Sequence, residues 1–283
     1  MAIKLMVDSA SDISKAEAEK LGIEMIPLII TFDGEDYYDG VDILPTQFYE
    51  KLIESDVLPK TSQITPFRFE EAFKKLTENG DEVIAITISS KLSGTYAAAA
   101  SAAEKFEGKV CVVDSLNAAI GERLLCEYAL RLIEEGKLGL KEIAAELDEK
   151  KRKIRLMALL GTLEYLKKGG RISAAVAFAG EILSLKPVIA VVEGEVKLVG
   201  KALGSRKGNN LLNTLVEKSN GIDFSMPYGV VYSGLDRSML EKYVKDSEKL
   251  WKHATNRISE YVIGATIGTH VGPGAVGVAF FEK

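Results

Sequence analysis

Short apolar runs alternate with amphipathic or alanine-rich segments along the first half of the chain. Apolar runs rich in β-branched residues predict buried parallel strands at 4–7, 25–32, 82–88 and 110–113. The segments between and after them predict helices at 15–21, 45–55, 66–79, 95–106 and 121–135. Because strands and helices alternate in this way, we predict an α/β fold built on a doubly wound parallel sheet.

The second half of the chain has a different pattern. The amphipathic segment 140–153 predicts a helix that bridges two domains. Beyond it we expect strands at 155–160, 187–192, 196–199, 228–232, 260–263 and 276–281. The helices expected among these strands are 163–168, 174–183, 211–218 and 238–253. We therefore predict an N-terminal α/β parallel-sheet domain over residues 1–153 and a C-terminal α+β domain over residues 154–283.

Composition and charge narrow the classes of partner. The 283 residues carry a net charge of −5 and no basic tract, so nucleic acid is not an expected partner. No run reaches the ~18 apolar residues of a membrane helix, and the first residues resemble a strand more than a signal peptide. Cys111 and Cys126 lie in apolar runs and are expected to be reduced. These features predict a cytoplasmic protein with at most transient contact with a membrane.

Small polar residues cluster where one predicted strand leads into a predicted helix. Ser90, Ser93, Gly94 and Thr95 lie at this junction. Free N–H groups and the positive end of the helix dipole favour an anion at such a position. Capping of the helix by Ser93 or Thr95 explains the same residues without any ligand. The segment therefore predicts either an anion site or a capped helix.

Three other segments carry candidate chemistry. An N-cap at Thr65 does not explain the hydroxyl-rich residues Thr61 and Ser62 that precede it. His270 lies in the glycine-rich segment 268–275, where we expect a loop, and a histidine there can donate to a carboxylate or a phosphate. Arg171 follows a basic turn, which is either a helix C-terminus or an exposed arginine that docks a partner or a phosphate.

Common enzyme motifs are missing from the chain. It has no nucleophile elbow, no phosphate-binding P-loop and no metal-ligand spacing of histidines or cysteines. Ser93 has no recognisable base beside it to activate it as a nucleophile. We therefore predict no catalytic residue and no metal site. The alternative is a small-molecule phosphate-handling enzyme, a kinase or a phosphatase, that binds phosphate at the Ser93 helix start.

Several motifs, in one order, resemble the DegV family, which includes the FakB-type bacterial fatty-acid-binding proteins. The resemblance covers about residues 3–281. The matching segments are 8–9 with Asp12, 27–28, 38–40, 61–63, 88–96, 113–115, 169–173, 186–187 and 268–274.

The resemblance implies two α/β domains that enclose a long-chain fatty acid, such as palmitate, between them. It implies that Thr61 and Ser93 hydrogen-bond the carboxylate, that Gly94 offers its backbone, and that His270 belongs to the same network. The residues expected to support this network are Ser62, Ser90, Thr95 and Arg206.

The resemblance also implies a function without catalysis by this chain. In family members with that role, a separate ATP-dependent fatty acid kinase phosphorylates the bound acyl group, and Arg171 matches a basic position suited to kinase docking. Leu203 stands where the family often has an arginine, and Arg206 is the nearest candidate to replace it. We therefore expect a carrier that presents a fatty acid to a partner in lipid transport or fatty acid metabolism, with no cofactor of its own.

Overall fold

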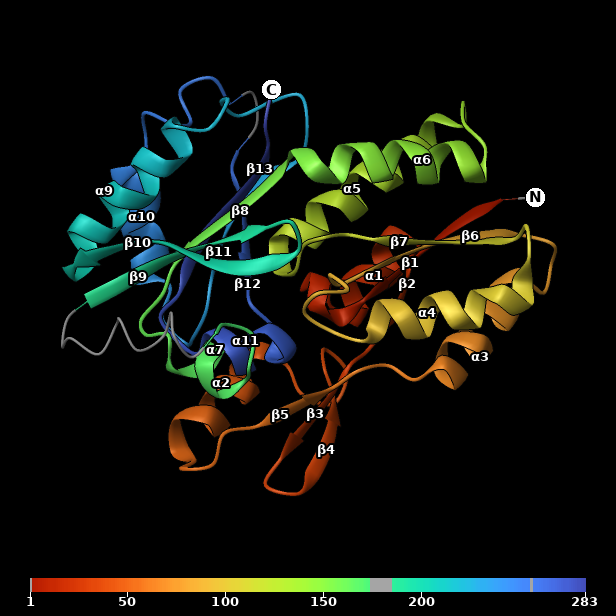
Figure 1. Ribbon diagram of the computed structural model, residues 1–283, viewed down its shortest axis with the longest axis horizontal. Helices are drawn as coiled ribbons and strands as arrows, with labels where there is room; N and C mark the ends of the chain where they lie inside the picture. Colours follow the sequence, from red (N-terminus) through yellow and green to blue (C-terminus); the bar gives the residue numbers. More distant parts are fainter. Residues whose placement is uncertain (1, 174–184, 255–256) are drawn as a thin grey trace.

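The computed structural model describes residues 2–173, 185–254 and 257–283, and its strands form three sheets (Figure 1). The helix predicted over 174–183 lies outside the described residues. Short 3-10 turns are η1 (Ser9–Ser11), η2 (Glu104–Phe106) and η3 (Lys151–Lys153).

The first sheet is parallel throughout, as the alternating pattern predicts. Its strands are β1 (Ile3–Asp8), β2 (Glu24–Ile26), β6 (Glu82–Thr87) and β7 (Val110–Asp114), in the order β2-β1-β6-β7. The helices of this half are α1 (Lys15–Leu21), α3 (Pro66–Thr77), α4 (Thr95–Ala103), α5 (Ala119–Glu135) and α6 (Leu140–Lys150). Ser14 caps the start of α1, and Gly22 ends it with a φ of 67°.

The single strand predicted over 25–32 is wrong, because the chain changes sheets at Pro27. After β2 it enters β3 (Ile29–Phe32), which pairs antiparallel with β4 (Glu35–Tyr38) and β5 (Lys60–Ser62) in a small separate sheet, covered by α2 (Pro45–Glu54). Proline has no N–H for a ladder, and the N–H of Leu28 donates to Ser9 Oγ at 3.0 Å instead. The apolar pattern continues across the break because both strands are largely buried.

The third sheet has six strands of mixed direction, in agreement with the predicted α+β character of the second half. They are β8 (Ile154–Leu159), β9 (Leu185–Val192), β10 (Glu195–Leu203), β11 (Tyr228–Tyr232), β12 (Ser259–Val262) and β13 (Val276–Phe281), in the order β10-β9-β8-β13-β11-β12. The accompanying helices are α7 (Glu164–Lys168), α9 (Gly204–Glu217), α10 (Ser238–Asp246) and α11 (Ala265–Val271). The strands predicted at 187–192 and 196–199 form an antiparallel hairpin, with Glu193 and Gly194 at φ of 50° and 84° as a two-residue turn requires.

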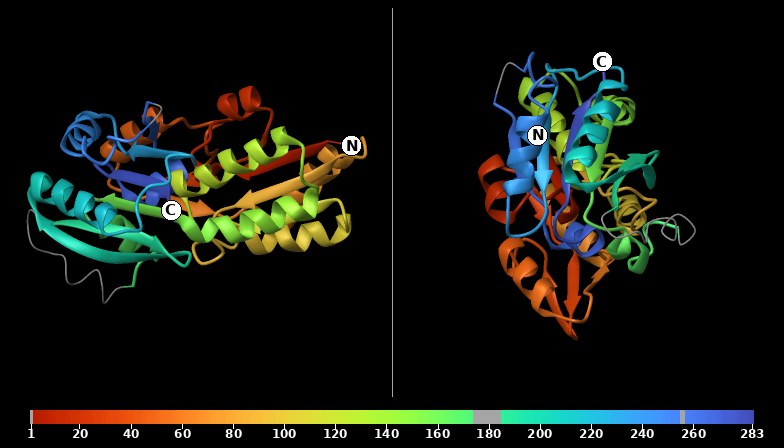
Figure 2. Two further views of the ribbon diagram at one scale, coloured as in Figure 1. Left: turned by 90° about the horizontal axis from the view of Figure 1, so that it is seen from above. Right: turned by 90° about the vertical axis from the view of Figure 1, so that its left-hand side faces the viewer.

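Helix α5 joins the two halves of the molecule. It packs on β1 and β6 of the first sheet and on β8, β11 and β13 of the six-stranded sheet. Seen from above, these two sheets lie end to end along the long axis (Figure 2). One buried apolar core runs through both, from Val7 and Ile86 to Leu156 and Phe281. In the sequence, all strands of the parallel sheet come before residue 153 and all strands of the six-stranded sheet come after it. The division into two independent domains stays a prediction.

Neither a membrane span nor a metal cluster is found in the part of the chain that the structure describes. Every described helix is too short or too polar to cross a bilayer. No group of three or more His, Cys, Asp or Glu side chains is close enough to hold a metal ion among these residues. Cys111 and Cys126 are both free, as the sequence predicts.

Candidate functional site

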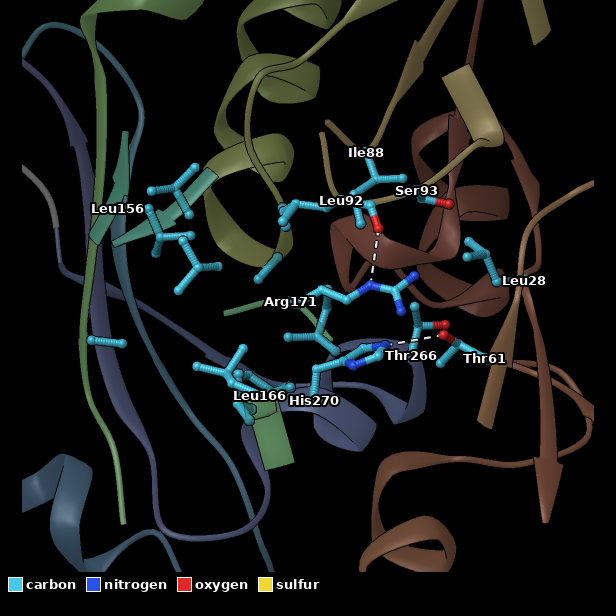
Figure 3. Close-up of a pocket in the computed structure, with 18 of the residues that line it drawn as sticks. Leu28, Thr61, Ile88, Leu92, Ser93, Leu156, Leu166, Arg171, Thr266 and His270 are labelled. Atoms are coloured by element: carbon cyan, nitrogen blue, oxygen red, sulfur yellow. Dashed lines mark hydrogen bonds between the residues drawn. The ribbon is translucent and has the colours of Figure 1, made fainter. Parts of the chain in front are cut away.

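A cavity of about 230 Å³ lies where the three sheets meet (Figure 3). The first half of the chain contributes β5, the residue after Pro27 and the start of α4, and the second half contributes β8, β9 and α11. Most of the lining is aliphatic, including Leu28, Ile88, Leu156, Ile189, Val191 and Val231. Such a lining favours hydrocarbon over a strongly hydrated ligand.

The polar lining groups gather at one end of the cavity. Thr61, Ser93, Arg171, Thr266 and His270 all lie there, whereas Leu156 on β8 lies at the opposite end (Figure 3). The structure thus brings together the three side chains that the sequence places around a carboxylate, Thr61, Ser93 and His270. The cavity is therefore amphipathic along its length.

Ser93 and Gly94 form the start of α4. Ser93 Oγ lies 2.9 Å from Thr95 Oγ1, and the N–H of Ile64 donates to Thr95 Oγ1 at 3.4 Å. Buried Thr95 thereby ties the start of α4 to the segment that carries Thr61. Ser93 Oγ also accepts from the N–H of Thr95 at 3.3 Å, so Ser93, which precedes the N-cap Gly94, bonds the first residue of α4 and also lines the cavity.

Gly94 is needed for close packing at this helix start. A Cβ at Gly94 would lie 1.9 Å from Oε1 of Gln63. The Gln63 side chain therefore lies directly over Gly94, and both residues line the cavity. Any larger residue at position 94 would displace the Gln63 side chain from the polar end.

The loop predicted around His270 is wrong, because His270 lies on helix α11. Asp39 caps this helix, with Oδ1 and Oδ2 accepting from the N–H groups of Ala265 and Thr266 at 3.0 and 3.1 Å. Gly268 lies inside the helix, where a Cβ would come within 2.6 Å of Phe48 Cε1. This glycine permits close helix packing and does not form a turn.

His270 is held as a neutral side chain. Its Nε2 lies 3.0 Å from Thr61 Oγ1, and its Nδ1 is buried with no hydrogen-bond partner among the described residues. Burial, and to a lesser extent the nearby charge of Arg171, together lower the pKa of His270 from 6.5 to about 4. A neutral imidazole has one N–H to donate and one nitrogen to accept, so the Thr61–His270 pair can bind a carboxylate without an ion pair.

We expect acid to destabilise the ligand-free protein through His270. Its folded pKa of about 4 lies below its ordinary 6.5, so the unfolded chain binds the proton more readily, and stability is lost as pH falls from 6.5 towards 4. The expected loss between pH 7 and pH 5 is about 2 kcal/mol. Urea unfolding of wild type and His270→Gln at both pH values measures it. Equal losses in the two proteins would show that His270 titrates normally.

Arg171 differs from its predicted placement as an exposed residue. It is half-buried, and its guanidinium lies in the cavity between Ser93 and His270 (Figure 3). Its Nε donates to the Leu92 carbonyl at 3.1 Å, and its Nη1 donates to the Gly169 carbonyl at 2.7 Å. No ion pair of Arg171 is found within the described ranges, so its charge favours an anion at the polar end. Its role in docking a partner stays a prediction.

The predicted supporting residues divide into two groups. Ser62 lines the cavity, and buried Thr95 bonds Ser93. Ser90 is an incorrect assignment, since it is exposed outside the cavity and its N–H donates to Asp114 Oδ1 at 3.1 Å. Arg206 is incorrect as well, because it is exposed on α9 and does not line the cavity.

Leu203, which stands where the family often has an arginine, also lies away from the cavity. Leu203 is the last residue of the edge strand β10, is 56% exposed, and is not a lining residue. The Leu203 side chain therefore has no part in the described cavity wall.

Sequence reasoning missed Thr266 as a lining residue. Thr266 lies one helical turn before His270 on α11, so both face the polar end of the cavity. The four-residue spacing of Thr266 and His270 is the signal that could have found it. That signal has meaning only on a helix, and the glycines around His270 favoured a loop.

Comparison with known proteins defines the class to which this fold and cavity belong. The family model described as "Uncharacterised protein, DegV family" matches residues 2–283. A DegV domain-containing protein of Caldanaerobacter subterraneus subsp. tengcongensis is 35% identical over 284 residues, covering 99% of each chain. The chain belongs to the DegV family.

Two solved structures are similar to this chain along nearly its whole length. A DegV family protein from Thermus thermophilus, described by its fatty acid binding, has a TM-score of 0.87 and 34% identity and covers 100% of both chains. A stearic acid-binding protein from Eubacterium ventriosum has a TM-score of 0.86 and 29% identity, covering 100% of this chain and 99% of its own. The predicted family and fold class are therefore confirmed.

Proposed function

We propose that this protein is a non-catalytic carrier that holds a long-chain fatty acid in the cavity. One observation carries the proposal: an aliphatic cavity has its polar groups at one end only. A fatty acid has the same distribution, with one carboxylate and a long hydrocarbon. Each methylene buried in the aliphatic part contributes roughly 0.8 kcal/mol to binding. The fatty acids that the Thermus and Eubacterium proteins bind support this assignment.

The carboxylate would lie among Thr61, Ser93 and His270, with Arg171 beside it. Neutral His270 and the two hydroxyls supply donors, and the Arg171 guanidinium supplies positive charge. The phosphate-handling alternative gains no support, because a small phosphorylated substrate would leave the aliphatic length of the cavity unused.

Denaturing mass spectrometry of an organic extract of the purified protein tests the proposal. We expect one long-chain fatty acid, such as palmitate, per chain. A lipid-free extract from folded protein that also fails to bind added palmitate would contradict the carrier function.

Ser93→Ala is expected to weaken fatty acid binding without unfolding the protein. A hydrogen bond to a charged group contributes about 1.5–3 kcal/mol, which corresponds to a rise in Kd of about ten- to 150-fold. Titration with palmitate measures the change. Ser90→Ala is the matched control, since Ser90 lies outside the cavity and its main chain makes the only bond that the structure gives it among the described residues. Equal affinities in the two variants would remove Ser93 from the carboxylate site.

We further infer that the carrier presents its ligand to a separate acyl kinase in lipid transport or fatty acid metabolism, with a cytoplasmic location and at most transient membrane contact. Arg171 supports this inference because it lines both the cavity and an adjoining surface groove, where Lys91 is a second cation and Lys197 pairs with Glu195. A docked enzyme would thus approach the polar end through a surface with cationic side chains. Incubation of the loaded protein with a fatty acid kinase and ATP, with acyl phosphate as the readout, tests it. Absence of acyl phosphate with an active kinase would contradict it.

A further inference from the structure

A second, mostly aliphatic groove of about 490 Å³ lies beside the cavity. Its lining includes Leu116, Met157, Ala190, Val192, Val199 and Leu215. Met157 and Ala190 are the strand neighbours of the cavity-lining residues Leu156 and Val191, so their side chains point to the other face of the sheet. The groove therefore lies across β8 and β9 from the cavity.

Four charged side chains belong to the groove lining, and two of them have ion-pair partners. Lys151 Nζ lies 2.6 Å from Asp148 Oδ1, and Arg155 Nη2 lies 2.6 Å from Glu282 Oε2. The other two, Arg152 and Glu193, are exposed, and the rest of the lining is mainly hydrocarbon. An apolar ligand fits this lining better than an anion does.

The cavity and the groove share part of their walls. Leu156 and Val191 line both spaces and are register partners on β8 and β9. Leu156 lies at the end of the cavity far from Ser93, Thr61 and His270 (Figure 3). The methyl end of a bound fatty acid would therefore point towards the groove.

The chain between β7 and α5 forms the facing wall of both spaces. Leu116 lines the groove and Ala119 lines the cavity, and these non-glycine residues have φ of 51° and 52°. The carbonyl of Asn117 between them accepts from Ser89 N at 2.8 Å and from Ser115 Oγ at 3.0 Å. A backbone in this unfavourable region persists only where its surroundings hold it, and such positions cluster at ligand sites. The boundary between the cavity and the groove therefore has two walls. Main-chain hydrogen bonds hold the segment 116–119 on one side, and the side chains of Leu156 and Val191 form the other.

We propose that the groove is a second acyl subsite, which takes the methyl end of a fatty acid that is too long for the cavity. The chain would pass between the Leu156–Val191 pair and the segment 116–119. The ligand class is a straight saturated acid longer than stearic acid. This inference rests on the proposed carrier function and extends it, because it assigns the surface that selects chain length.

The test compares affinities for palmitic, stearic, arachidic and behenic acids, whose chains lengthen by two methylenes at each step. In wild type we expect Kd to fall with length, by about tenfold for each pair of methylenes that enters the groove. Val199→Trp fills the groove from β10, where Val199 is 37% exposed and lines the groove but not the cavity. This variant should bind palmitic acid as wild type does and lose the gain for the longer acids.

Leu203→Trp is the matched control on the same strand, since Leu203 is 56% exposed and lines neither space. Val192→Trp, 44% exposed in the same groove, repeats the test if Val199→Trp fails to fold. Wild-type affinity that falls beyond stearic acid, or a groove variant that behaves as Leu203→Trp does, would overturn the second subsite and leave the carrier function standing. Failure to bind any of the four acids would overturn both.

Discussion

The free energy of unfolding of Asp8→Asn, relative to that of wild type, is expected to rise by about 4 kcal/mol between pH 4 and pH 8. Asp8 is fully buried at the end of β1, and burial raises its pKa from 3.8 to about 7. The N–H groups of Ile88 and Ala10 lower the pKa, and the charge of Asp39 raises it. A folded pKa above the unfolded one means that the stabilisation is full below pH 3.8 and is lost as pH rises through 7.

Asparagine cannot ionise, so the difference between Asp8→Asn and wild type reports on Asp8 and the buried carboxyls coupled to it, such as Asp39, and not on His270. Urea unfolding across the pH range measures that difference, which should change by about 1 kcal/mol per pH unit on average between pH 4 and pH 7. Asp33→Asn is the control for removal of a carboxyl, since Asp33 is exposed. A constant offset between Asp8→Asn and wild type would show that Asp8 ionises in the folded protein as it does in water.

Arg123→Ala should lower the free energy of unfolding by about 3 kcal/mol. The Arg123 side chain is almost fully buried, pairs with Glu17 and with Glu127 Oε1 at 2.9 Å, and lies 3.9 Å from the ring centre of Tyr261. These contacts join α1, α5 and β12. Glu17 and Glu127 keep some contact with water, at 37% and 27% exposure, which places the loss at the lower end for a broken buried pair.

Arg123→Lys separates charge from shape in this cluster. Lysine keeps the positive charge but has neither the planar fork nor the stacking surface of arginine, so an intermediate loss is expected. Chemical unfolding at neutral pH measures both variants. A loss below 1 kcal/mol for Arg123→Ala, the range of an exposed ion pair, would contradict a structural role for the cluster.

The sequence pattern predicts the parallel sheet and the hairpin because local signals determine both. The run Val83–Ile88 is β-branched except at Ala85 and apolar except at Thr87, and Glu193–Gly194 suits a two-residue turn. The break at Pro27 escapes detection, since two strands of different sheets share one apolar run. The helix around His270 escapes for another reason: Gly268 is required by contacts with Phe48 and Tyr49, which are remote in sequence.

The candidate site also combines residues that local sequence signals reveal with residues whose positions depend on contacts remote in sequence. The hydroxyl-rich segments around Thr61 and Ser93 stand out locally, and the family resemblance assigns them to one carboxylate. Local reasoning cannot show that Arg171 turns inward, because its direction follows from bonds to the carbonyls of Leu92 and Gly169. It also places Arg206 near the network by distance along the chain, whereas α9 carries that residue to the surface.

The bond between Thr61 and His270 joins residues that are 209 positions apart. Contacts of such long sequence separation form late in folding, because a large loop must close before they contribute any stability. The polar end of the cavity is thus assembled only after both halves of the chain have folded onto α5. A fatty acid carboxylate at the proposed site would therefore meet its full set of polar partners only in a molecule whose two halves have already come together.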